Sequence, residues 1–148
     1  MNTIDPQKAA QVWQRVRGTA RLSDRELTTM ISNAWTTGAT YLKLSRQFQG
    51  KESATLRQLH SEQLAHVACL KGIYTLITGT RPTIKAAPLP YQDPEAILRR
   101  CYGRGMQALA DYESKTEDPE YGPVFSRLAL REQDHCRSLL ELIGNLKK

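Results

Sequence analysis

Two histidine-centred polar pairs interrupt apolar helical stripes and are candidates for binding a metal ion. His66 follows Gln63 by three positions, and His135 follows Glu132 by three positions. Residues three apart lie side by side on a helix, so each pair would aim two polar groups at one point of the interior. Imidazole and carboxylate groups are common ligands of iron and zinc, and helical bundles build internal metal sites from such pairs.

The stripes around the two pairs predict two of the helices that would position them. Their residues recur at alternating spacings of three and four, which is typical of a buried helical seam. The polar pair falls at the same place in both seams, which suggests an old duplication of one helical hairpin. The first seam comprises Leu56, Leu59, Gln63, His66, Leu70, Ile73 and Ile77, and the second comprises Phe125, Leu128, Glu132, His135, Leu139, Leu142 and Leu146.

Helix signals elsewhere predict one all-α domain, an antiparallel four-helix bundle over residues 1–148. Ser23 and Glu26 have the spacing of a capping box at the start of a long helix. Asp93 before Pro94 is a favourable start for a later helix, and Gly79 is a favourable end for an earlier one. The predicted parts are a short N-terminal helical segment (1–20), a first hairpin (23–78), a long proline-rich crossover (79–92) and a second hairpin (93–146).

Composition and charge exclude several functional classes. The chain has 40% hydrophobic and 24% charged residues, as a globular domain would, and no run of about 18 apolar residues for a membrane span. Its net charge of +6 is spread along the chain among acids, so a nucleic-acid partner is not expected. The N-terminus has no secretory pattern, and we therefore expect a cytoplasmic protein. The amphipathic stretch 6–16, with Trp13, would pack on the bundle or form a homodimer.

Three cysteines are scattered along the chain and do not form a recognisable motif. Cys69, Cys101 and Cys136 contain no C-x-x-C spacing, so neither a zinc knuckle nor a disulfide framework is predicted. A buried thiol more often packs as a small apolar side chain than binds a metal. We therefore expect these cysteines to be core residues, although Cys69, one turn after His66, is close enough to be a ligand.

The helical pattern resembles the ferritin-like superfamily, specifically its small rubrerythrin-like members. In those proteins a helix with an inward glutamate and a tyrosine seven residues later precedes a helix with Glu-x-x-His, and the pair is repeated. The stretch DPEYGPVFSRLALREQDHCRSLLELIG carries the resemblance most closely. The resemblance implies a four-helix bundle around a di-iron site, with oxidase or peroxidase activity.

Only three of the six ligand positions implied by the resemblance carry the expected type of residue. Ala34 and Gly105, each seven residues before a tyrosine, stand where glutamates are expected, and Gln63 replaces a third. His66, Glu132 and His135 match. Two dications with a single carboxylate would repel each other in a low-dielectric core, so we expect the di-iron activity to be lost.

Two functions from different classes remain. The ligand count favours a binding or structural protein without a cofactor, whose residues Gln63, His66, Glu132 and His135 hydrogen-bond one another. The alternative is a metal-binding protein or oxidoreductase in which His66, Glu132 and His135 hold one iron or zinc ion. In both readings Glu62 and Arg131 are expected to face solvent, because successive helical positions are rotated by about 100°.

Overall fold

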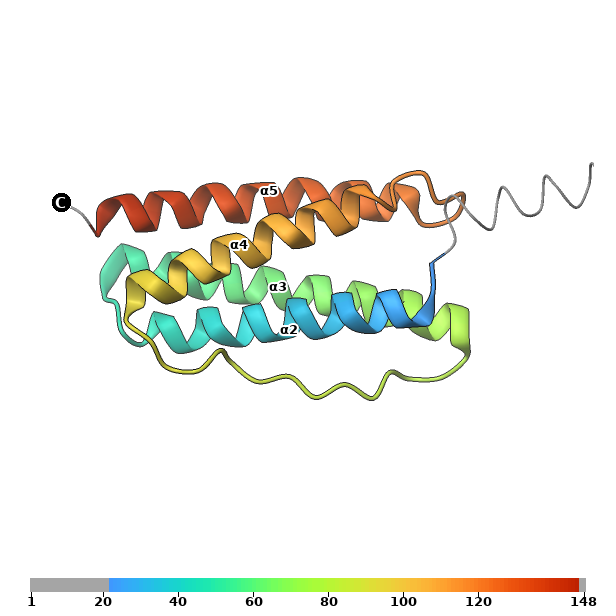
Figure 1. Cartoon of the computed structure of the whole chain (residues 1–148), viewed down its shortest axis with the longest axis horizontal. Coiled ribbons are helices and arrows are strands. Elements are labelled where there is room, and N and C mark those ends of the chain that lie inside the picture. Colours follow the sequence, from blue (N-terminus) through green and yellow to red (C-terminus); the bar gives the residue numbers. More distant parts are fainter. Residues whose placement is uncertain (1–21, 147–148) are drawn as a thin grey trace, which may run out of the picture.

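Four α-helices in two antiparallel hairpins make up residues 22–146, the part of the chain that the computed structural model describes. The helices are α2 (Asp24–Ser45), α3 (Gly50–Thr78), α4 (Pro94–Glu113) and α5 (Gly122–Asn145). Helix α2 packs on α3 and α4 packs on α5, and the long crossover makes α4 start at the same end as α3 (Figure 1). The predicted four-helix, two-hairpin architecture is thus confirmed. The predicted N-terminal segment with Trp13 lies outside the described residues.

The helix ends form where local capping chemistry permits them. The Ser23 side chain accepts from the Glu26 amide and the Glu26 carboxylate accepts from the Ser23 amide, so the predicted capping box is present. Asp93 Oδ1 accepts from two amides of the first turn of α4. Gly79 ends α3 with φ of 75°, a left-handed conformation that favours glycine. No helix among residues 22–146 is long and apolar enough to cross a membrane.

The interior consists of two apolar clusters with polar side chains among the buried residues of the same helices. One cluster includes Ile31, Leu70 and Phe125, and the other includes Leu56 and Leu139. Both predicted seams are buried along most of their length, as expected. Their last residues are the exception: Ile77 is 42% exposed and Leu146 is 39% exposed, because each lies in the final turn or just beyond its helix.

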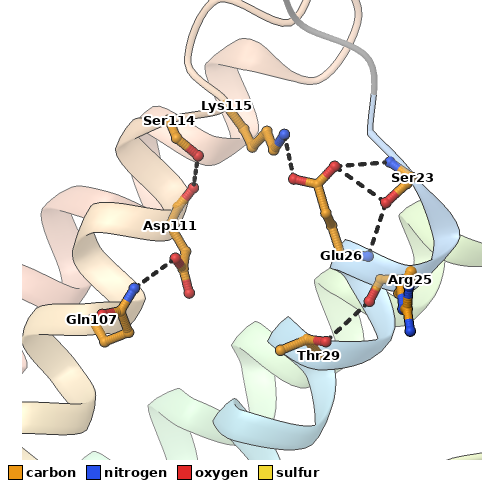
Figure 2. Close-up of polar contacts among 8 residues, drawn as sticks. All are labelled: Ser23, Arg25, Glu26, Thr29, Gln107, Asp111, Ser114 and Lys115. Atoms are coloured by element: carbon orange, nitrogen blue, oxygen red, sulfur yellow. Dashed lines mark hydrogen bonds and ion pairs between the residues drawn. The ribbon is translucent and has the colours of Figure 1, made fainter.

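Polar contacts join the two hairpins where α4 meets α2. At one end of the bundle the Lys115 ammonium contacts the Glu26 carboxylate, which also accepts from Ser23 (Figure 2). Farther along, Arg104 Nε donates to Thr37 Oγ1 at 3.1 Å, and Arg104 also reaches Asn33. These contacts, with the apolar core, fix how the hairpins sit against each other and therefore how α3 faces α5.

The crossover between α3 and α4 contacts α2 at Leu89. Leu89 is buried, and its amide donates to Thr40 Oγ1 at 2.9 Å. Thr40 in turn donates to the carbonyl of Thr36, so its hydroxyl is fixed in place. Residues 79–93 form no helix and most of them are exposed, but the segment is anchored to α2 at Leu89.

Candidate metal centre

The structure brings His66, Glu132 and His135 together in the middle of the bundle. His66 comes from α3 and the other two from α5, and all three side chains are at most 2% exposed. His66 Nδ1 lies 3.4 Å and His135 Nδ1 lies 3.6 Å from the same atom, Glu132 Oε2. One ligand atom of each residue lies within 4.8 Å of the other two. The predicted site residues thus face a common point.

A second carboxylate, Glu62, also belongs to the cluster. Its Oε2 lies 2.9 Å from His135 Nε2, and its side chain is only 31% exposed. The expectation that Glu62 faces solvent is therefore wrong. Residue 62 lies on the side of α3 next to α5, where a side chain of glutamate length can reach across the interface. The sequence pattern did not indicate this contact, because the helical position of Glu62 is rotated away from that of His66.

The polar atoms of the cluster are poorly satisfied by the residues that surround them. Among the residues described, no hydrogen-bond partner is found for Gln63 Oε1, either nitrogen of His66, either oxygen of Glu132, or His135 Nδ1. The contacts of 3.4 and 3.6 Å are ion-pair distances rather than good hydrogen bonds. Within residues 22–146, the contact between His135 Nε2 and Glu62 is therefore one part of the hydrogen-bond network expected for a cofactor-free core, and the atoms named above take no part in such a network. Leaving such a group unpaired costs about 1–3 kcal/mol.

The electrostatics of the cluster favour an ionised Glu132 beside positive charge. Burial acts to raise the pKa of Glu132, but His135 and His66 outweigh it and hold this pKa below its ordinary value. Burial acts to lower the pKa of His135, but Glu132 and Glu62 outweigh it and raise this pKa. The positive charge at this point can be a proton on His135 or a metal cation.

The contact with Glu62 also determines what the other nitrogen of His135 can do. A neutral His135 that donates from Nε2 to Glu62 presents its Nδ1 lone pair to Glu132. A lone pair and a carboxylate oxygen repel each other unless a cation lies between them. This is the arrangement of a metal-ligating histidine that is oriented by an outer carboxylate.

The three positions that lack the expected glutamate are also in the interior of the bundle. Gln63 is buried, and Ala34 and Gly105 are buried but offer no ligand atom. A Cβ placed on Gly105 would lie 3.4 Å from Glu132 Oε1 and 2.8 Å from Cys136 Sγ. The backbone of α4 at Gly105 therefore lies next to the Glu132 carboxylate.

The cysteines and tyrosines near the site are neutral packing groups. Burial raises the pKa of Cys101 to about 12 and that of Cys136 to about 11, so both stay protonated. Burial also raises the pKa of Tyr41 well above its usual value. The Tyr112 ring meets the His66 ring edge-on, at 6.2 Å between centroids. None of the three cysteines belongs to the group of ligand atoms.

Two grooves between α3 and α5 reach the histidines from outside. One, of about 300 Å³, is lined by His66, and the other, of about 420 Å³, is lined by His135. Each groove thus leads to one of the two buried histidines, and Glu62 borders both grooves.

Comparison of the chain with models of known protein families, with curated proteins and with solved structures found no match. What is established is an all-α four-helix bundle with a buried His-Glu-His cluster. The interpretation of that cluster therefore rests on its own geometry.

Proposed function

We propose that the protein binds one divalent metal ion, iron(II) or zinc, through His66, Glu132 and His135. One observation carries this proposal: three buried side chains offer ligand atoms within 4.8 Å of one another, and most of these atoms have no hydrogen-bond partner among the described residues. Two histidines and one carboxylate form a known ligand set for a single metal ion. The charge is also suitable, because an ionised Glu132 lies close to Nδ1 of both imidazoles.

We further propose that the bundle is a ferritin-like one that has lost its second metal. The support is the residue pattern: Ala34, Gln63 and Gly105 stand at positions where that family has glutamates. Glu62, the one additional carboxylate of the cluster, is engaged with His135 Nε2. A second dication would therefore meet too little negative charge in the core.

A metal ion with three protein ligands keeps coordination positions for an outside molecule, as catalytic rather than purely structural sites do. In this arrangement Glu62 would hold the His135 ring with Nδ1 turned inward. Phe125 and Leu128 on α5 and Val67 and Leu70 on α3 are buried apolar neighbours along the same helices, and they limit the access of water.

A second candidate is a cofactor-free structural or binding protein, and the raised pKa of His135 favours it. In that case a protonated His135 would lie between Glu132 and Glu62 and supply the positive charge itself. The two candidates place different cations at the same point, so metal analysis separates them.

The test is metal stoichiometry of the full chain, purified without a histidine tag, stripped of metal and then given zinc or iron(II). We expect one metal per chain, and we expect His66→Ala and His135→Ala each to abolish binding. His60→Ala is the matched control, because His60 is a half-buried histidine of α3 whose Nδ1 contacts the Gly38 carbonyl at 2.8 Å. It should bind metal normally.

Each other outcome is informative. A chain that binds no metal would overturn the proposal in favour of the cofactor-free candidate. A stoichiometry close to two would overturn the charge argument against a second ion.

A further inference from the structure

The two grooves that reach the histidines correspond to each other by one constant spacing in the sequence. The spacing of 69 positions that separates His66 from His135 also relates most of the residues that line them. Leu59 in one groove thus corresponds to Leu128 in the other, and Ser138 corresponds to Cys69. The two grooves are therefore equivalent in position and differ in chemistry. We call them the glutamate groove, with Glu62 and His135, and the arginine groove, with Arg127, Arg131 and His66.

In the glutamate groove the chain itself supplies a carboxylate to the histidine. Glu62 Oε2 lies 2.9 Å from His135 Nε2, and Glu62 Oε1 accepts from Gln58 Nε2 at 3.3 Å. Gln58, which lies one helical turn before Glu62 on α3, thus helps to hold the Glu62 carboxylate in place. The outer nitrogen of His135 is satisfied.

In the arginine groove the equivalent positions carry cations, and the histidine has no partner. Arg127 corresponds to Gln58 and Arg131 corresponds to Glu62. Within residues 22–146, His66 Nε2 has no hydrogen-bond partner although the side chain is only 2% exposed. The groove therefore has donors where its counterpart has an acceptor.

The two arginines are exposed, and no counter-charge is found for them among the described residues. They lie four positions apart on α5, where like charges face each other and repel. In the described part of the chain, neither takes part in an ion pair or a side-chain hydrogen bond. Glu62 borders the groove, but its carboxylate is held by His135 and Gln58. An anion between the arginines would relieve the repulsion.

We infer that the arginine groove binds a small organic carboxylate, which accepts hydrogen bonds from Arg131 and Arg127 and from His66 Nε2. The bound carboxylate would do for His66 what Glu62 does for His135. The inference rests on the proposed metal site, because His66 donates from Nε2 when its Nδ1 faces a metal ion. The guanidinium fork suits a carboxylate geometrically.

The size and walls of the groove limit the rest of the ligand. A volume of about 300 Å³ is at the small end of ligand sites. Val124, Leu128 and Ala65 provide apolar walls, which suit a short aliphatic chain. We therefore take butyrate as the probe.

The test uses the full chain loaded with one zinc ion and titrated with butyrate. We expect saturable binding that shifts the Nε2 resonance of His66 in nitrogen–proton NMR spectra and leaves that of His135 in place. Arg131→Gln should raise the Kd at least about tenfold, the usual effect of losing a charged hydrogen bond. Arg137→Gln is the matched control: it removes the same charge from α5 at an exposed site that pairs with exposed Asp134, and it should leave the Kd unchanged.

The outcomes separate this inference from the metal proposal. If zinc binds but butyrate does not, or binds Arg131→Gln equally well, the inference is overturned and the metal site stands. If inorganic phosphate binds as tightly as butyrate, the groove is not selective for a carboxylate and the stated ligand class is wrong. If zinc does not bind, the metal proposal and this inference fall together.

Discussion

The two histidines of the cluster differ in one contact, and that contact gives them different chemistry. His135 shares its Nε2 with Glu62, whereas His66 Nε2 has no partner among the described residues. A carboxylate on the outer nitrogen fixes the tautomer and makes the imidazole a better metal ligand. Glu62 is therefore a positioning residue that would act on a metal through His135.

Removing Glu62 tests this role directly. We predict that Glu62→Ala lowers zinc affinity about 10–100-fold, because His135 loses the group that orients it. Glu62→Gln keeps an acceptor and should retain more of the affinity. Titration against a zinc chelator measures the change. Glu141→Ala, which removes an exposed carboxylate from α5, is the control, and equal affinities in all these proteins would refute the role.

At this scale the sequence predicted the central residues and missed their surroundings. The seam spacing was sufficient to bring His66, Glu132 and His135 to one point. The helical position of Glu62, which is rotated away from that of His66, predicts a side chain that faces solvent, but a rotation angle says nothing about the reach of a long side chain. Nor could spacing indicate that the cluster would lack internal hydrogen bonds, because this depends on distances of a few tenths of an ångström.

Among the helices, α4 contains one glycine in open space and another in close contact with α5. A Cβ on Gly103 would meet nothing within 4 Å, whereas a Cβ on Gly105 would meet Cys136 Sγ at 2.8 Å and Glu132 Oε1 at 3.4 Å. The close approach of α4 to α5 at the candidate site thus depends on a missing side chain. The starts of α2 and α4 were predictable, because Ser23 and Asp93 cap them and such caps are local signals, whereas α3 and α5 begin without a side-chain cap.

The two glycines make a matched pair of substitutions. We predict that Gly103→Ala raises the free energy of unfolding by about 0.5–1 kcal/mol, since alanine restricts the unfolded chain and favours helix. Gly105→Ala should instead lower it by about 1 kcal/mol or more, because overpacking against Cys136 exceeds this gain. Urea denaturation of both variants measures the difference. Two equally stabilised variants would show that α4 and α5 are not in close contact here.

For the whole molecule, the docking of one hairpin on the other combines apolar burial with a few polar joints. The contact between Lys115 and Glu26 is one of them (Figure 2). Burial acts to raise the pKa of Glu26, but Lys115 and Ser23 outweigh it and lower this pKa from 4.5. The arrangement of two hairpins joined by a long crossover was predictable from the sequence. The residues that join the hairpins were not, because they are distant from one another in the sequence.

The lowered pKa of Glu26 gives the joint a pH dependence. Its stabilisation is fully present above the unfolded pKa of 4.5 and is lost as the pH falls through the lower folded pKa. We predict that Lys115→Gln reduces stability at neutral pH by at most about 1 kcal/mol, and that the difference declines below pH 4.5 and is lost once the pH lies below the folded pKa of Glu26. Urea denaturation over this range, with Lys85→Gln in the exposed crossover as control, checks it. A difference independent of pH would contradict the assignment.

The crossover between α3 and α4 also acts as a covalent tether. The proposed metal ligands come from both sides of it, since His66 belongs to the first hairpin and Glu132 and His135 belong to the second. With residues 79–93 intact, each hairpin meets the other at the effective concentration of an intramolecular reaction. A cut within that segment would turn assembly of the site into a bimolecular association. Metal uptake by the split protein would then depend on protein concentration, as it does in a heterodimer.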